Sequence, residues 1–243
     1  MALAEDGKVF SWGDGLYGRL GHGDGENQLL PKLVAALVGK QVVQISCGGY
    51  HSLAVTASGA VYSWGYGDDG KLGHGNQEHQ MLPKEVEALR GRQVTMVSAG
   101  GSHSLALTAS GEVLSWGGGY YGKLGHGDEE NQLRPKVVEA LQGTRVVQIS
   151  GGNIHTLALA EDGKVFSWGD GGNGLLGHGH ERDLDVPTEV EALRGKHVME
   201  VRAGYDTSLV LTWAREVLEF GVSLRDAPDF ERKVLQPEMI FPL

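Results

Sequence analysis

Histidine offers the widest chemistry in this sequence, and seven of its ten copies recur at fixed positions. Four lie in the motif LGHG (His22, His74, His126 and His178), and three follow a Gly-rich turn (His51, His103 and His155). Imidazole nitrogens bind zinc, so a repeated set of histidines suggests a metal centre. Equivalent positions lie too far apart to share one ion unless they point down a central axis, whereas each repeat can need the same local hydrogen bond. We therefore predict that these seven histidines are structural and that no metal is bound.

Other residues with catalytic potential do not form a recognisable set. No nucleophile, base and orienting acid stand out from the pattern, and Ser58 and Ser110 look like hairpin-turn residues. The strings GDGLYG and GYGDDG resemble phosphate loops, but a dinucleotide fingerprint needs a following helix in a βαβ unit. Cys47 is the only cysteine, so no internal disulfide can form, and we expect a buried, unreactive thiol. We expect no enzymatic activity and no cofactor.

The elements that position these residues form a repeat of 52 residues. The phrase SWGDGLYGRLGHGDGENQLLPK begins at Ser11 and returns at Ser63 and Ser115, with a looser copy at Ser167. The in-phase tryptophans are Trp12, Trp64, Trp116 and Trp168. The 39 glycines, about 16% of the chain against ~7% on average, fall at fixed places and therefore mark turns. A fixed period of this length indicates a repeat architecture.

Each repeat predicts four short antiparallel strands. In the second copy, Val42–Ser46, Ser52–Thr56 and Ala60–Trp64 are rich in β-branched and aromatic residues and are separated by turn sequences. A Gly-rich loop follows, and Pro83 precedes a fourth run at Glu85–Leu89. Four such strands in about 50 residues are typical of one propeller blade. The predicted fold is an all-β propeller, in which the tryptophans pack against the neighbouring blade.

We predict one domain over residues 1–243. It contains a truncated repeat (1–37), three full repeats (38–89, 90–141 and 142–193) and a degenerate repeat (194–243). Met1 aligns with Leu157, so the sequence starts within the second strand of a blade. In the last repeat Thr207 replaces the histidine and Phe220 replaces the tryptophan. Because the final LQPEMIFPL is similar to LRPKVVEAL in the third repeat, we expect this blade to be complete, with a shorter loop.

The combined pattern SWG…GKLGHG…P…VxAL…GGxHSLALT resembles the regulator-of-chromosome-condensation repeat. The match covers residues 1 to about 221 closely and the tail weakly. The resemblance implies a propeller, usually of seven blades, so about five blades would form an open arc or part of a seven-bladed ring. A smaller closed ring and pairing with another chain are the alternatives. SWGDGxYGxLGHG and EALxG are most similar to the propellers of HERC-type ubiquitin ligases.

The overall charge favours protein partners over nucleic acid. The chain has 21 basic and 31 acidic residues, a formal net charge of −10, which argues against binding to phosphate backbones. A protein with a basic patch remains a suitable partner. The longest apolar run, Leu33 to Val38, is far shorter than the ~20 residues of a membrane helix, and we find no secretion signal. We expect a cytoplasmic or nuclear protein.

Recognition residues are expected where the repeats differ, because shared positions are set by the fold. Two loop stretches vary, and they carry tyrosines (Tyr17, Tyr66, Tyr120 and Tyr121) and acids (Asp68, Asp69, Asp128, Glu129 and Glu130). Loops on a rigid scaffold often carry recognition, and tyrosine beside acids suits a protein interface. The alternative is that these loops are polar only for solubility.

We predict a non-catalytic protein-interaction scaffold, which the resemblance relates to recognition in ubiquitin transfer. Its partner would be a ubiquitin-pathway protein or a small GTPase. The resemblance also implies an alternative, guanine-nucleotide exchange on a GTPase of the Ran type, although no insertion is present to form a wedge. Light sensing, as in the plant ultraviolet-B receptor, is excluded because Tyr50, Ser102 and Ile154 stand where that receptor has tryptophan in GWRHT turns.

Overall fold

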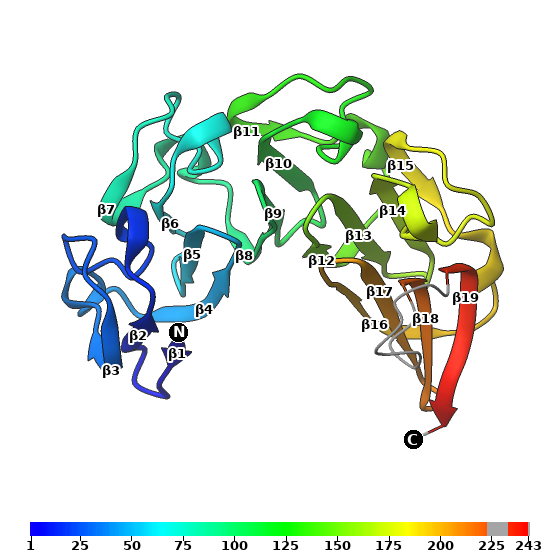
Figure 1. The fold of residues 1–243 in the computed structure, drawn as a ribbon, viewed down its shortest axis with the longest axis horizontal. Helices are drawn as coiled ribbons and strands as arrows, with labels where there is room; N and C mark the ends of the chain where they lie inside the picture. Colours follow the sequence, from blue (N-terminus) through cyan, green and yellow to red (C-terminus); the bar gives the residue numbers. More distant parts are fainter. Residues whose placement is uncertain (223–232, 243) are drawn as a thin grey trace. The chain divides into compact units, whose positions relative to one another are not determined.

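The computed structural model describes residues 1–222 and 233–242, which contain nineteen β-strands and eight short 3-10 helices (Figure 1). The strands form five separate antiparallel sheets. No helix in the described part of the chain has the length and apolarity needed to cross a membrane. The chain divides into two compact units.

The first unit comprises residues 1–110, 114–118 and 131–137. Its first sheet has three strands: β1 (Ala2–Leu3), β2 (Val9–Gly13) and β3 (Gln28–Leu33). Its second sheet has four: β4 (Val42–Cys47), β5 (His51–Thr56), β6 (Val61–Gly65) and β7 (Gln80–Glu85). The third sheet contains β8 (Val94–Ala99), β9 (His103–Thr108), β10 (Val113–Gly117) and β11 (Gln132–Val137).

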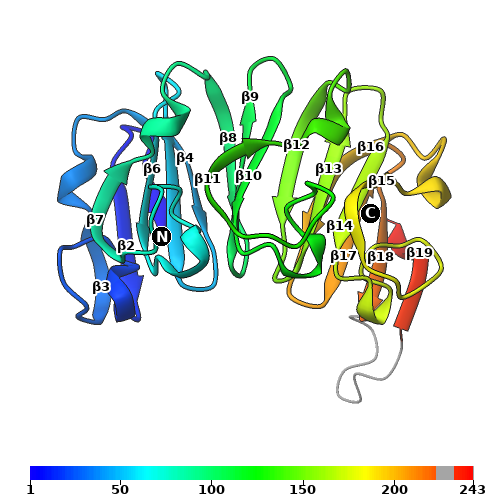
Figure 2. The same ribbon diagram turned by 90° about the horizontal axis from the view of Figure 1, so that it is seen from above.

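The second unit comprises residues 111–113, 119–130 and 138–243. The fourth sheet contains β12 (Val146–Gly151), β13 (His155–Ala160), β14 (Val165–Gly169) and β15 (Leu184–Glu189). The fifth contains β16 (Val198–Ala203), β17 (Thr207–Thr212), β18 (Glu216–Val222) and β19 (Lys233–Pro242). Within each sheet, strands that follow one another in the chain lie side by side (Figure 2).

The first three strands of the second repeat lie where the sequence predicted them, but the fourth does not. The strand is Gln80–Glu85, and Glu87–Leu89 forms a 3-10 helix instead. Val86 and Leu89 are each 1% exposed, so the chain turns after the strand to bury both side chains. Pro83 is tolerated because β7 is an edge strand that pairs only with β6.

The fifth repeat completes its sheet, as predicted. The segment that resembles LRPKVVEAL lies in β19 as far as Pro242, and β19 pairs with β18. The predicted shorter loop falls on residues 223–232, outside the described residues.

The tryptophans of repeats two to four are the largest buried side chains. Trp64, Trp116 and Trp168 are 0% exposed. Trp64 packs on the long loop of the preceding repeat, where its Nε1 donates to the Arg19 carbonyl at 3.0 Å. Gly21 in that loop has φ +79°, and a Cβ added to it would lie 2.9 Å from Trp64 Nε1, so the loop backbone lies directly against the ring.

Trp12 departs from the predicted packing. It is 41% exposed, and no long loop of another repeat in the described part of the chain packs on its ring as one does on Trp64. The same loop-on-ring contact recurs at the other end of the chain, where Phe220 packs against Gly177. The long loop of one repeat is therefore completed by the repeat that follows it. Residues 18–23 illustrate this, because Gly18 lies against Met81 and the Gly23 N–H donates to the Met81 carbonyl at 3.0 Å.

Side chains of the first strands also join neighbouring sheets. The Gln44 amide accepts from the Val97 N–H at 2.8 Å and donates to the Val97 carbonyl at 3.3 Å. Ser46 Oγ accepts from the Ala99 N–H at 3.0 Å. Gln148 makes the same pair of bonds to Val201 in the second unit. These bonds satisfy backbone groups at the edge of each next sheet.

Candidate docking site on the long loops

His22, His74 and His178 of the LGHG motifs close their own loops. His22, His74 and His178 lie 2.9, 3.0 and 2.9 Å from the Oγ of Ser11, Ser63 and Ser167. Each hydroxyl also donates to a leucine carbonyl of the loop at 2.6–2.7 Å. Because that bond uses the only hydroxyl proton, the imidazole Nε2 must be the donor to the serine. His126 is half-buried in its repeat.

The histidines after the Gly-rich turn are buried, and two of them connect neighbouring sheets. His51 Nε2 donates to Ser104 Oγ at 2.8 Å, and Ser104 Oγ donates to the Lys71 carbonyl at 2.7 Å. His155 makes the equivalent bond to Ser208 at 2.8 Å. Burial lowers the pKa of His51 to about 3 and that of His155 to about 4. His103 is likewise 0% exposed.

These histidines do not gather around a common point. Within residues 1–222 and 233–242, no group of three or more His, Cys, Asp and Glu residues is arranged to hold a metal ion. The imidazoles instead act as local hydrogen-bonding elements, with the LGHG histidine in the first four repeats and the histidine after the Gly-rich turn in the second to fourth. Their neutral, buried form makes the fold sensitive to acid.

Cys47 is exposed, so the expectation of a buried thiol is wrong. Its counterpart in the next repeat, Ala99, is 7% exposed and lies beside Ser46 of the preceding repeat. The first sheet has no strand equivalent to β4 that could cover Cys47 in the same way.

Four aromatic rings from two repeats meet on the first unit. This aromatic cluster consists of Tyr17, Tyr50, Tyr66 and His79. The Tyr17 and Tyr66 centroids are 4.4 Å apart, and Tyr50 lies 6.4 and 6.0 Å from them. His79 lies 5.1 Å from Tyr17 and 4.8 Å from Tyr66. Tyr50 is 48% exposed, and His79 is also exposed, so the cluster faces solvent.

Two cations support the tyrosine rings. The Arg19 guanidinium lies 4.5 Å from the Tyr50 centroid, and Lys71 Nζ lies 4.4 Å from the Tyr66 centroid. Lys71 is 3% exposed, and this burial lowers its pKa despite the nearby carboxylates. Cation–π contacts strengthen when the cation is removed from water. The Tyr50 and Tyr66 rings are therefore held in place by contacts within the chain.

In three of the long loops, a side-chain acceptor at an equivalent position binds a glycine N–H of the loop backbone. His79 Nδ1 accepts from the Gly67 N–H at 3.1 Å, and Asn27 and Asp183 accept from the equivalent glycines at 2.9 Å. At the tip of each loop a residue adopts positive φ: Tyr17 (60°), Asp69 (59°), Tyr121 (62°) and Asn173 (58°). Left-handed backbone is uncommon for tyrosine and is often associated with functional sites.

The carboxylates beside the cluster are only partly neutralised. The Tyr66 hydroxyl donates to the Asp68 carboxylate, and this bond raises the pKa of Tyr66 to about 12. Asp14 lies 3.6 Å from Arg19, and Asp69 lies 4.0 Å from Lys71. Both distances are long for ion pairs, so the aromatic cluster has an acidic border.

A family model for the RCC1-like domain matches residues 1–225. The chain belongs to the RCC1-like domain family. Human E3 ubiquitin-protein ligase HERC2 is 45% identical over 225 residues, which are 91% of this chain and 5% of that protein. The ultraviolet-B receptor UVR8 of Arabidopsis thaliana is 40% identical over 224 residues, 92% of this chain and 51% of the receptor. The chain thus spans at most about half the length of these two relatives.

Solved RCC1-like structures have the same fold. Human WBSCR16 matches with a TM-score of 0.84 and 29% identity, over 96% of this chain and 62% of that one. Prp20p from Saccharomyces cerevisiae, described together with its binding to Gsp1p and histones, matches with a TM-score of 0.82 and 26% identity, over 98% and 60%. The predicted all-β propeller blades are confirmed, and they correspond to part of these larger RCC1-like chains.

The structure of this RCC1-like domain places the predicted recognition residues in two groups. Tyr17, Tyr66, Asp68 and Asp69 come together in the first unit. In the second unit, Tyr120 and Tyr121 form an exposed edge-to-face pair, with centroids 5.6 Å apart. The remaining predicted acids, Asp128, Glu129 and Glu130, lie further along the same loop.

Four members of the site were not predicted from the sequence. Tyr50 lies in the turn between β4 and β5, and His79 lies at the end of a long loop. Arg19 and Lys71 lie beneath the rings. The sequence did contain an indication for His79, because the repeats differ at this position: the other three carry Asn or Asp there.

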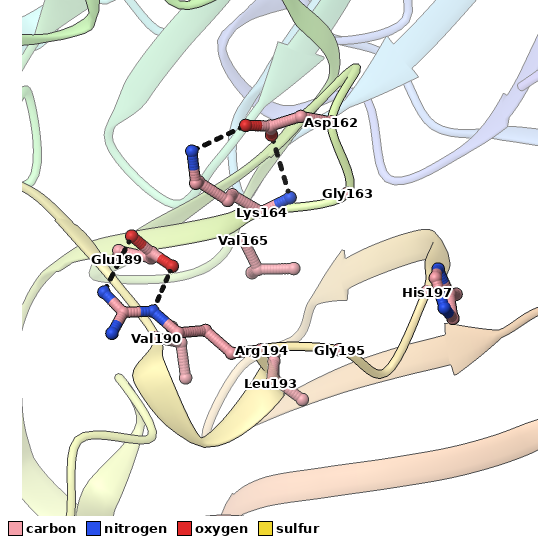
Figure 3. Close-up of a pocket in the computed structure, with 10 residues that line it drawn as sticks. All are labelled: Asp162, Gly163, Lys164, Val165, Glu189, Val190, Leu193, Arg194, Gly195 and His197. Carbon is pink, nitrogen blue, oxygen red and sulfur yellow. Dashed lines mark hydrogen bonds and ion pairs between the residues drawn. The ribbon is translucent and has the colours of Figure 1, made fainter.

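A hollow of about 240 Å³ in the second unit is an alternative candidate for a binding site (Figure 3). Val165, Val190 and Leu193 line its apolar part. Its charged rim is already paired, with Lys164 Nζ 2.6 Å from Asp162 and Arg194 Nε 2.7 Å from Glu189. With those charges satisfied, the hollow offers less to a ligand than the aromatic cluster.

The hollow exists because one contact between neighbouring repeats is missing. A Cβ added to Gly59 or Gly111 would lie 3.1 and 3.0 Å from the backbone of the next repeat. A Cβ added to the equivalent Gly163 would find no atom within 4 Å. The opening therefore follows from looser packing of the degenerate fifth repeat.

Proposed function

We propose that this RCC1-like domain is a non-catalytic protein-docking module that binds through the aromatic cluster and its acidic border. The observation that carries this proposal is the exposure of Tyr50 among rings already fixed by Arg19 and Lys71. Rigid tyrosines lose little conformational entropy on binding and are frequent hot spots of protein interfaces. The acidic residues at the border would supply orientation and partner choice.

The similarity to HERC2 supports a partner in the ubiquitin pathway. HERC2 is an E3 ubiquitin-protein ligase, and this chain resembles a segment equal to 5% of its length. In this proposal the propeller recognises a protein and contributes no chemistry of its own. The ligation reaction would belong to other parts of such a protein.

Docking through the cluster predicts that two tyrosine substitutions remove the same partners. We expect Tyr50→Ala and Tyr66→Ala to lower recovery of specific proteins from a cell lysate at least about fivefold. The measurement is quantitative mass spectrometry of proteins retained by the immobilised chain. Tyr205→Ala is the matched control, since Tyr205 is 72% exposed and lies in the other unit. A retained set that is identical for all variants would contradict docking at this site.

Guanine-nucleotide exchange is the second candidate, and the likeness to Prp20p favours it. Prp20p is described with its binding to Gsp1p, and this chain covers 60% of its length. Repeats two to four each have 52 residues, so they contain no insertion that could act as a wedge. Protein docking and nucleotide exchange can be distinguished by the rate at which a Ran-type GTPase releases GDP.

A docking module predicts no change in GDP release from purified Ran when this chain is added. The release rate is followed with a fluorescent GDP analogue, after a melting curve shows that the chain is folded. A strong acceleration would replace the docking proposal with exchange activity. Tyr50→Ala would then show whether the aromatic cluster contacts the GTPase.

A further inference from the structure

The acidic charge of the chain is concentrated in the four long loops. These loops span residues 14–27, 66–79, 118–131 and 170–183. Each contains three acidic residues and one lysine or arginine, which gives it a net charge of −2. Together they account for eight of the ten negative charges in the formal net charge of −10. The loops make up less than a quarter of the sequence, so this charge is a local property and not a general one.

The exposed charge of these loops is more negative than the residue count suggests. Lys71 and Lys123 are 3% and 0% exposed, and each lies against a tyrosine ring. Their charges are therefore directed into the protein. Within the loop over residues 66–79, whose one basic residue is Lys71, the carboxylates are therefore the more accessible charged groups.

Several of these carboxylates lack a cation of the same chain. Among the described residues, no Lys or Arg lies within ion-pair distance of Asp24, Glu26, Asp68 or Glu78. Three of the four acidic residues elsewhere in the first unit form ion pairs: Asp6 with Lys8 at 2.6 Å, and Glu85 and Glu87 with Arg90 at 2.7 and 3.8 Å. Acids without a nearby cation are therefore concentrated in the loops that carry the aromatic cluster.

We infer that the aromatic cluster binds a protein segment that presents an arginine or lysine side chain. This inference rests on the docking function proposed above and names the chemistry of the partner. The rings already accept cations, as Arg19 over Tyr50 and Lys71 over Tyr66 show. Tyr50 remains about half exposed, and the adjacent Tyr66 hydrogen-bonds Asp68, which has no Lys or Arg within ion-pair distance among the described residues. A guanidinium or ammonium can therefore contact both a ring and a carboxylate.

Other segments fit this surface less well. An acidic segment would bring like charges against two loops that each carry a net charge of −2, which is unfavourable. A purely apolar segment would cover the tyrosines. It would also remove water from the unpaired carboxylates and offer them no hydrogen-bond donor or cation in its place, which is unfavourable. Only a basic segment satisfies both the rings and the acids.

The loop over residues 118–131 provides an internal comparison. Like the loops of the aromatic cluster, it contains three acidic residues and one basic residue. Its aromatic group, however, is the pair Tyr120 and Tyr121. Neutralising two acids in this loop changes the net charge of the chain by +2, which equals the change produced by neutralising Asp68 and Asp69 beside the aromatic cluster. It leaves Tyr17, Tyr50, Tyr66 and His79 untouched.

The test uses two fluorescein-labelled peptides of twelve residues, alternating Gly with Arg and Gly with Glu. Fluorescence anisotropy with the full chain should show binding of the arginine peptide and none of the glutamate peptide. We expect Asp68→Asn/Asp69→Asn to weaken binding about tenfold and Tyr50→Ala about fivefold. Tyr50→Phe should bind as the unmodified chain does, because it keeps the ring. Glu129→Gln/Glu130→Gln should change binding less than about twofold.

The variants are chosen to fold. Asn accepts the same hydrogen bond as Asp68 and tolerates the positive φ of Asp69, and melting curves check each protein. Equal weakening by the two double variants would overturn the inference, because binding would then follow net charge alone. Full binding by Tyr50→Ala would overturn it as well.

The result is separable from the docking proposal. If the arginine peptide fails to bind while proteins retained from lysate still depend on Tyr50 and Tyr66, docking stands and the cationic partner is wrong. If the peptide binds through the cluster but retained proteins do not depend on it, the cation site stands and the docking function fails.

Discussion

Replacing Trp64 with alanine is expected to cost about 3–5 kcal/mol of unfolding free energy, whereas Trp12→Ala should cost less than about 1 kcal/mol. The two residues occupy the same position in successive repeats. Trp64 is 0% exposed and donates a hydrogen bond to the Arg19 carbonyl, whereas Trp12 is 41% exposed. The difference arises from the loop of the preceding repeat, which covers only Trp64.

Urea unfolding followed by far-ultraviolet circular dichroism measures both losses without relying on tryptophan emission. Trp116→Ala serves as a second buried case in the same unit. Equal losses for Trp12→Ala and Trp64→Ala would contradict the packing argument. Retained stability in Trp64→Ala would show that the loop contacts contribute little.

Acidification from pH 7 to 4.5 is expected to destabilise the fold by about 2–3 kcal/mol for each of His51 and His155. Their pKa values are about 3 and about 4 when folded, below the ordinary value of 6.5. The unfolded chain therefore binds more protons, and stability falls as the pH drops below about 6.5. The loss continues until the pH reaches the folded pKa values.

This window separates the histidines from the carboxylates. Asp6, Glu85, Asp162 and Glu189 have a pKa lowered by neighbouring cations, so their stabilisation is present above their ordinary values and is lost only at more acidic pH. His51→Gln and His155→Gln keep a side-chain N–H donor and do not titrate. We expect each variant to flatten the dependence of the urea midpoint on pH between 6.5 and 4.5. An unchanged pH profile would show that other groups are responsible.

The strands could be predicted because the repeat displays each one several times. A run such as Val42–Ser46 has in-phase copies, and its β-branched residues point to a strand in every copy. The fourth strand was misplaced because Glu85–Leu89 is as apolar as a strand. Its apolar side chains are instead buried by a 3-10 turn, which depends on the neighbouring sheet and not on local pattern.

The candidate site could be predicted only in part. Tyr17 and Tyr66 were found because the repeats differ there, but they occupy different positions within their repeats. Their contact depends on how the loop of one repeat lies beside the next.

The burial of Lys71 could not be predicted either, because a lysine side chain normally remains in water unless an aromatic ring and carboxylates take the place of the water around it. Trp12 and Cys47 were misjudged for a related reason, since each lacks the covering element that its counterparts have.

The completion of each long loop by the following repeat sets an order in which the protein can mature during synthesis. Tyr17 stands on a loop that Trp64 and Met81 hold in place, and Tyr66 stands on a loop held by Trp116 and Leu133. A nascent chain that has just released the first of these loops from the ribosome therefore carries its tyrosine on an unfinished support. The aromatic cluster of the first two repeats is therefore fully supported only after the third repeat has been translated.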